Sequence, residues 1–107
     1  MSDNDVLVVL CNCPDTETAR KLAATAVEQR LAACVNIIPG VESVYHWQGK
    51  IQNDTESTLL IKTSGNTFDA LREHLQVHHP DELPEIIAVP VVRGLTGYLD
   101  WVRESTS

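Results

Sequence analysis

The chain is short of basic residues. Its 107 residues include 8 Lys and Arg against 15 Asp and Glu, which gives a formal net charge of −7. Nucleic-acid phosphates and anionic membrane surfaces both repel such a protein, so we expect neither as a partner. Cations are the natural attraction, although most acidic surfaces serve only solubility.

Long apolar runs and disulfide patterns are absent as well. No segment approaches the roughly 20 apolar residues of a membrane helix, and no basic region followed by an apolar core stands at the N-terminus. The cysteines number three, and an odd number is better interpreted as free thiols in a reducing compartment. We therefore expect a cytoplasmic protein in which residues 1–107 form one domain, long enough to bury a core without disulfides.

Common ligand motifs are missing too. The 5 glycines form neither of the two phosphate-binding patterns, G-x-G-x-x-G and G-x-x-x-x-G-K-S/T. No cysteine pair has the Cys-x-x-Cys spacing of a structural zinc site. The sequence thus predicts no nucleotide-binding loop, and it contains no repeats or low-complexity segments.

Two long segments rich in β-branched and aromatic residues, 34–47 and 51–63, occupy the middle of the chain. They predict a β-hairpin with a turn at residues 48–50 and a bend or bulge at Pro39 and Gly40. Each arm would reach roughly 40 Å, whereas a helix of about 14 residues covers only about 21 Å of sheet. Half of the hairpin must therefore be covered by something else.

Strands and helices are predicted on both sides of this hairpin. Residues 6–11 are apolar at odd and even positions, as in a strand buried on both faces. Residues 83–92 have the same character, with prolines that favour an edge strand. Helical spacing of apolar residues and the caps Asp15 and Thr96 predict three helices. These helices span residues 16–30, a segment that contains Phe68 and ends before Pro80, and residues 95–103.

The predicted order is βαββαβ with a short terminal helix, which is the α+β ferredoxin-like arrangement. Right-handed crossovers give an antiparallel sheet of order 4-1-3-2 with both longer helices on one face. The first and fourth strands are apolar on the other face as well. We therefore predict that another subunit covers that face and that the protein is an obligate oligomer.

This topology gathers reactive side chains at one edge of the sheet. The first strand ends where the fourth begins, and the second helix ends there too. The residues brought together are Cys11, Cys13, His78, His79 and Glu85. A thiolate with one or two imidazoles is a ligand set suited to copper or zinc. Cys34 begins the second strand at the opposite end and is not expected to join them.

Other roles for these residues are open. The helix dipole favours histidines near a helix C-terminus, and buried cysteines often act as small apolar fillers. Cys11 beside an imidazole base is also a conceivable nucleophile. A cleft between subunits would be lined by Tyr45, Trp47, Lys62 and Glu85, or these residues would simply pack in an interface.

Several blocks of the sequence resemble the CutA divalent-cation tolerance proteins. The blocks lie at residues 30–36 (RLAACVN), 41–51 (VESVYHWQGKI), 61–63 (IKT), 79–80 (HP), 84–86 (PEI) and 97–101 (GYLDW). They follow the family's order and span nearly the whole chain. The resemblance implies a ferredoxin-like domain assembled as a tight homotrimer, similar in architecture to the PII nitrogen-regulatory proteins.

The resemblance also implies a non-enzymatic, cytoplasmic role in tolerance to copper and other divalent metals. Bacterial members are expected to bind copper through a cysteine at the end of the first strand and a His-His pair, here Cys11, His78 and His79. Asp81 stands where the family usually has an aromatic residue. The alternative implied by the resemblance is a PII-like signalling or scaffold trimer that binds a small molecule or protein partner in clefts between subunits.

Overall fold

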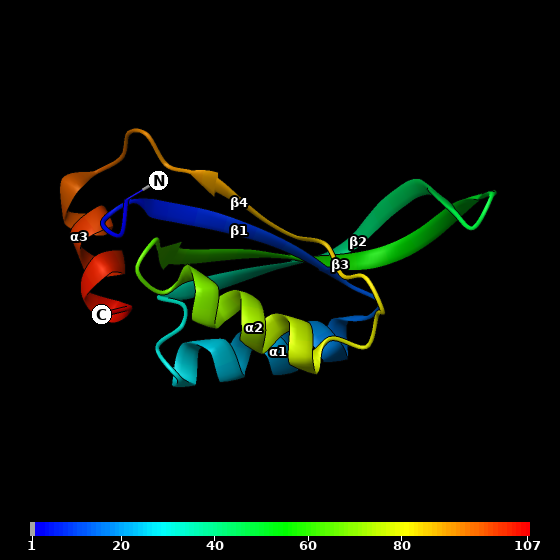
Figure 1. The fold of residues 1–107 in the computed structure, drawn as a ribbon, viewed down its shortest axis with the longest axis horizontal. Helices are drawn as coiled ribbons and strands as arrows, with labels where there is room; N and C mark the ends of the chain where they lie inside the picture. The colour runs from blue at the N-terminus through cyan, green and yellow to red at the C-terminus, as the bar shows by residue number, and fades with distance from the viewer. Residues whose placement is uncertain (1) are drawn as a thin grey trace.

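The computed structural model describes residues 2–107 and contains every predicted element (Figure 1). The elements are β1 (Val6–Cys13), α1 (Thr16–Glu28), β2 (Cys34–Trp47), β3 (Lys50–Ser64), α2 (Phe68–His78), β4 (Ile86–Pro90) and α3 (Thr96–Ser105). The strands form one sheet in the order β2-β3-β1-β4, and all neighbours are antiparallel. The predicted ferredoxin-like fold and sheet order are therefore confirmed.

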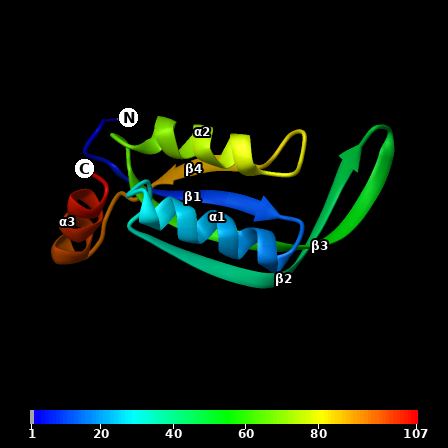
Figure 2. The same ribbon diagram turned by 90° about the horizontal axis from the view of Figure 1, so that it is seen from below.

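The helices α1 and α2 cover one face of the sheet, and α3 packs at one end (Figures 1 and 2). Alternate residues of β1, including Val9 and Cys11, point into this layer and are fully buried. They meet the apolar stripes of the two helices, to which Leu22, Leu71 and Leu75 belong. This layer of strand and helix side chains is the hydrophobic core.

The opposite face of the sheet is also apolar, but no helix of residues 2–107 lies on it (Figure 1). Val8 and Leu10 are half-buried and pair with Val89 and Ile87 of β4. Val89 and Ile87 remain 49% and 51% exposed. The first strand is thus apolar on both faces, as predicted, while a single chain buries only one of them.

The β2-β3 hairpin is interrupted once and closed by a tight turn. A bulge lies between Ile38 and Val41, where Gly40 has φ 71°, which confirms the predicted irregularity. Gln48 and Gly49 have φ 51° and 79°, the left-handed conformations of a two-residue type I′ turn. Lys50 pairs with Trp47 and therefore belongs to the strand, not to the turn as predicted.

The outer half of the hairpin extends past both helices (Figure 1). Its apolar side chains Val44 and Ile51 are 66% and 69% exposed. The hairpin accounts for much of the molecule's 44 Å long axis, against 26 and 22 Å for the other two. The hairpin arms are therefore longer than the helices that cover the sheet, as expected.

Several element ends differ from the predicted ones. α1 ends at Glu28, not Arg30, because Arg30 adopts a left-handed φ of 59°. β4 spans Ile86–Pro90 and not residues 83–92. Pro84, which cannot donate to the ladder, lies before its first residue. The N-cap of α3 is Leu95 and not Thr96, and it makes no side-chain cap bond.

β1 runs on to Cys13, two residues beyond its predicted end, by pairing with Thr58 and Ser57 of β3. This extension keeps Cys13 in the regular alternation of the strand. Within residues 2–107, no helix has the length and apolar character needed to cross a membrane.

At the start of α1, Asp15 Oδ1 accepts a hydrogen bond of 2.7 Å from the Thr18 amide. The Asp15→Ala variant should unfold at a lower temperature, because this amide loses its partner. The Asp15→Asn variant keeps an oxygen acceptor, so its unfolding temperature should fall less.

The contribution of Asp15 to the stability of the fold depends on pH. The Thr18 hydrogen bonds hold the pKa of Asp15 below its ordinary value, which is about 3.9. A carboxyl with a depressed folded-state pKa stabilises the fold above its unfolded pKa, and this contribution disappears as the pH falls through the folded pKa. Melting curves should therefore show the difference between wild type and Asp15→Asn shrinking below about pH 4. A difference that is constant down to pH 2.5 would contradict this account.

Candidate metal centre

The centre begins with the last residues of β1. Because side chains alternate along a strand, Cys11 and Cys13 both point toward the helix layer, and both are fully buried. Asn12 points to the other face, where its side-chain oxygen accepts a 2.7 Å hydrogen bond from Thr58. The strand thus places two thiols side by side beneath the helices.

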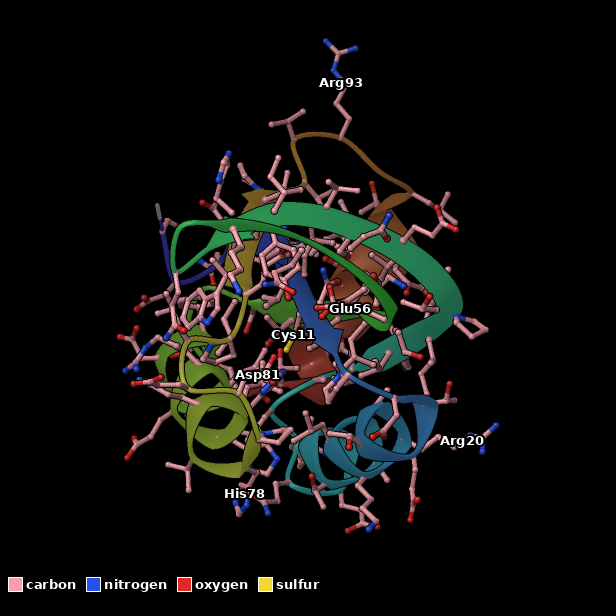
Figure 3. All side chains as sticks on the ribbon, turned by 90° about the vertical axis from the view of Figure 1, so that its right-hand side faces the viewer. Cys11, Arg20, Glu56, His78, Asp81 and Arg93 are labelled. Carbon is pink, nitrogen blue, oxygen red and sulfur yellow. The ribbon has the colours of Figure 1, made fainter. Side chains whose placement is uncertain are left out.

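The two neighbouring histidines at the end of α2 point in different directions because of Pro80. A residue before proline is disfavoured in the helical conformation, and His79 accordingly takes φ −78° and ψ 137°. Its side chain turns into the protein and is buried. His78 is still helical and lies on the outer surface of α2, away from Cys11 (Figure 3).

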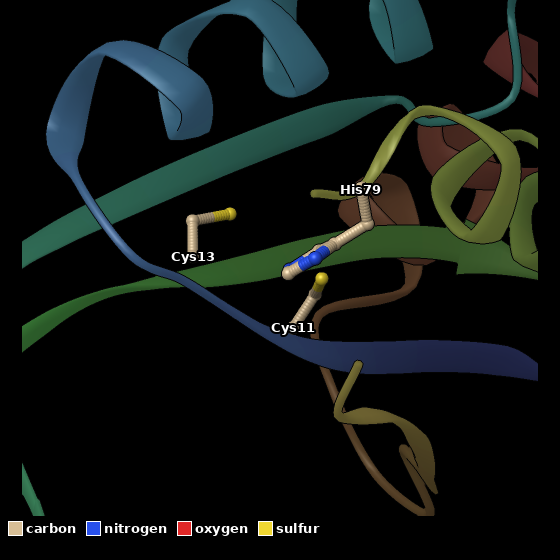
Figure 4. Close-up of side chains that lie close together, drawn as sticks. All are labelled: Cys11, Cys13 and His79. Atoms are coloured by element: carbon tan, nitrogen blue, oxygen red, sulfur yellow. The ribbon is translucent and has the colours of Figure 1, made fainter. Parts of the chain in front are cut away.

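The side chains of Cys11, Cys13 and His79 meet in one buried cluster (Figure 4). The two sulfur atoms and a ring nitrogen of His79 all lie within 4.8 Å of one another. Two thiols and one imidazole are a soft to intermediate donor set of the kind that binds copper or zinc.

Both ring nitrogens of His79 already have partners. Nε2 lies 2.7 Å from the carbonyl oxygen of Asn12 and therefore donates to it, while Nδ1 accepts from the Asp81 amide at 3.0 Å. These bonds assign a neutral imidazole with its proton on Nε2. A carboxylate oxygen of Asp81 also lies 3.9 Å from Nδ1. Ligation by His79 thus requires one of its two hydrogen bonds to be released, and the Nδ1 bond comes from an exposed loop residue.

The two thiols share a hydrogen bond that separates their acidities. This bond, together with burial, raises the pKa of Cys11 well above its usual range. The same bond lowers the pKa of Cys13, since it stabilises a thiolate there. The two protons of the pair therefore leave in separate steps. A metal ion that binds both sulfurs must displace these protons.

The structure brings together two of the three predicted ligands, Cys11 and His79. It places His78 outside the cluster and Cys34 at the far end of β2. Cys13, which the topology predicts nearby but which is not among the predicted ligands, joins the cluster. The signal for Cys13 was its spacing of two residues from Cys11, which on a strand puts both side chains on one face.

A large acidic cavity of about 1010 Å³ lies next to the cluster, between the hairpin and the loop before β4. Its lining includes Tyr45, Trp47, Asp54, Glu56, Asp81, Glu82 and Glu85. Three of the residues predicted to line a cleft, Tyr45, Trp47 and Glu85, are among them. The fourth, Lys62, is not, and its ammonium group donates to the side chain of Asn36.

Electrostatics make this cavity unsuited to anions. Among the described residues 2–107, five carboxylates line it, and no lysine or arginine does. The Tyr45 hydroxyl donates to Asp54, and this bond raises the pKa of Tyr45 to about 12. The tyrosine thus stays neutral at physiological pH, and the net field in the cavity favours cations.

Comparison with known proteins agrees with this fold. The model of the CutA1 divalent ion tolerance protein family matches residues 7–105. The divalent-cation tolerance protein CutA of Thermus thermophilus is 50% identical over 99 residues, which cover 92% of this chain and 96% of that protein. A chloroplastic CutA of Arabidopsis thaliana is 46% identical over 100 residues, 94% of this chain and 55% of the plant protein.

A solved structure supports the same assignment. The divalent cation tolerance protein Cut A1 from Thermus thermophilus superposes with a TM-score of 0.93 at 48% sequence identity. The superposition covers 95% of this chain and 99% of the Thermus chain. Because the family model matches residues 7–105, the chain belongs to the CutA1 divalent ion tolerance family.

Proposed function

We propose that this protein is a non-enzymatic, trimeric copper-binding protein that serves in tolerance to copper and other divalent metals. The observation that carries the proposal is the buried cluster of Cys11, Cys13 and His79, whose donor atoms lie within 4.8 Å of one another. Thiolates favour Cu(I) among the common cellular ions, and imidazole completes a set that copper accepts.

The environment of the cluster suits a bound metal ion better than it suits catalysis. Both thiols are buried, so a bound ion would be screened from water and oxidants. A cysteine nucleophile needs a lowered pKa and access to its substrate. Cys11 has the opposite properties, since its pKa is raised and its side chain is buried.

Two surfaces support assembly into a trimer. The sheet face opposite the helices exposes Ile87 and Val89, and the outer hairpin exposes Val44 and Ile51. Subunits that pack these surfaces together would gain the burial that one chain cannot provide. The number of three chains in a closed ring is taken from the family resemblance described above.

The proposed compartment is the cytoplasm. Its support is that Cys11, Cys13 and Cys34 are all free thiols, as expected in a reducing environment. The name of the plant relative places that protein in chloroplasts.

The acidic cavity supports a second candidate function, a PII-like sensing or scaffold trimer. The cavity's aromatic side chains, Tyr45 and Trp47, stand among carboxylates. Such a combination attracts a cationic small molecule or a basic peptide segment, since aromatic faces and carboxylates both favour positive charge. Copper binding that depends on the thiols would favour the first proposal, whereas binding of an organic cation at Trp47 would favour the second.

The copper prediction compares four single variants by competition with a chromophoric Cu(I) chelator under anaerobic conditions. The variants Cys11→Ser, Cys13→Ser and His79→Ala should each lower Cu(I) affinity at least roughly tenfold, because even outer partners of metal ligands change affinity by about 10- to 100-fold. Cys34→Ser, a thiol outside the cluster, should bind like wild type.

Loss of His79 leaves the Asn12 carbonyl without its partner and lowers stability, so the wild-type protein supplies an independent measurement. Under mildly denaturing conditions, bound Cu(I) should protect two of the three cysteines, Cys11 and Cys13, from alkylation. Equal Cu(I) affinity in wild type and Cys11→Ser, or protection of Cys34 alone, would overturn the proposed site.

The assembly prediction uses two exposed valines as a matched pair. Val44 on the hairpin is 66% exposed and Val77 on the outer side of α2 is 69% exposed. Val44→Asp should impair assembly and folding together, because an obligate interface resembles a core. Val77→Asp should leave both unchanged.

Sedimentation equilibrium of the wild type should give a mass near three times the 11.8 kDa of one chain. A wild-type monomer at micromolar concentration, or equal effects of the two substitutions, would refute the trimer.

A further inference from the structure

A pair of histidine side chains lies on the outer surface of α2. His74 and His78 are one helical turn apart, and their ring centroids lie 4.8 Å from each other with the planes tilted by 54°. Residues separated by four positions face the same side of a helix. Helical zinc sites of the His-Glu-x-x-His type use the same spacing.

The distance between the rings matches that of a chelate. Bonds from imidazole nitrogen to a metal are about 2.0–2.1 Å long, so two imidazoles in neighbouring coordination positions hold their centroids roughly 4.5–5 Å apart. The observed 4.8 Å falls in this interval. The separation of the two rings is therefore compatible with sharing one ion.

One of the two rings is already oriented by a neighbouring helix. Thr25 Oγ1 of α1 lies 2.8 Å from His74 Nε2, and it also lies 3.0 Å from the Lys21 carbonyl oxygen. The hydroxyl has one proton, which it donates to that carbonyl, so it accepts from Nε2. This arrangement leaves the lone pair of His74 on Nδ1. A fixed tautomer of this kind is the usual support of a ligating histidine.

The surroundings give the pair access to solvent. A groove of about 380 Å³ runs between α1 and α2 beside the two rings. The charged group that lines it, the Lys21 ammonium, is paired with Glu17 at 3.4 Å, which weakens its repulsion of cations. The groove lies on the helix layer, on the side of the sheet away from the open apolar face, and His78 points outward there (Figure 3).

We propose that His74 and His78 form a second, surface-accessible metal site for divalent transition ions such as Ni²⁺, Cu²⁺ and Zn²⁺, with water completing the coordination. Neutral imidazoles are suited to these borderline ions, whereas the buried thiols favour Cu(I). The site is independent of the buried cluster, because it shares no ligand with Cys11, Cys13 or His79. It also gives His78 a partner other than Cys11.

The test uses Ni²⁺, which imidazoles bind well, with the untagged full-length protein. Calorimetric titration of a Cys11→Ser, Cys13→Ser double variant should show one Ni²⁺ per chain, because the thiols are no longer available. Adding His74→Ala or His78→Ala should weaken this binding at least roughly tenfold, since one imidazole replaces a chelate. His46→Ala, which removes a lone exposed histidine on the hairpin, should leave it unchanged.

His74→Ala is the decisive variant, because a site made of Cys11, His78 and His79 would keep its Ni²⁺ and Cu(I) affinities when His74 is lost. The proposal expects reduced Ni²⁺ affinity and unchanged Cu(I) affinity. Copper(II) broadening of NMR signals should centre on residues 74–78 in the wild type, which checks the site without any substitution. Ni²⁺ binding that is equal with and without His74, or broadening centred on another part of the chain, would overturn the proposal.

Discussion

The pairing of β1 with two neighbours is the interaction on which the rest of the structure depends. β1 forms ladders with β3 on one side and β4 on the other, and α1 and α2 pack against its buried side chains. Because the ladder with β3 continues to Cys13, the strand carries two thiols into the helix layer in regular alternation. The same alternation puts Val8 and Leu10 on the open face, which is why a single chain is incompletely covered.

A second constraint, Pro80, determines how the histidines are used. It ends α2 and forces His79 into an extended conformation, so adjacent residues point to opposite sides of the helix layer. His79 reaches the buried thiols, whereas His78 stays beside His74. One proline thus separates a buried, soft donor set from an exposed pair of borderline donors, and the two sets suit different metals.

The fold could be predicted from the sequence because its signals are local and agree with one another. Asp15 caps α1, Gly40 marks the bulge, and the apolar spacing gives each helix its buried stripe. The site was predicted less completely, because topology brings residues to one edge without setting the directions of their side chains. His78 and His79 could not be told apart by position alone. The effect of Pro80 on ψ, and the two-residue spacing of Cys11 and Cys13, were the physical clues that distinguish the actual cluster.

X-ray absorption at the copper edge of the Cu(I)-loaded wild-type protein tests the central claim most directly, because it counts the donor atoms around the ion. A cluster of Cys11, Cys13 and His79 predicts a first shell of two sulfurs and one nitrogen. A first shell of one sulfur and two nitrogens would contradict the role of Cys13 and would indicate that a second imidazole takes its place. A shell without sulfur would contradict the claim that the buried thiols bind the metal.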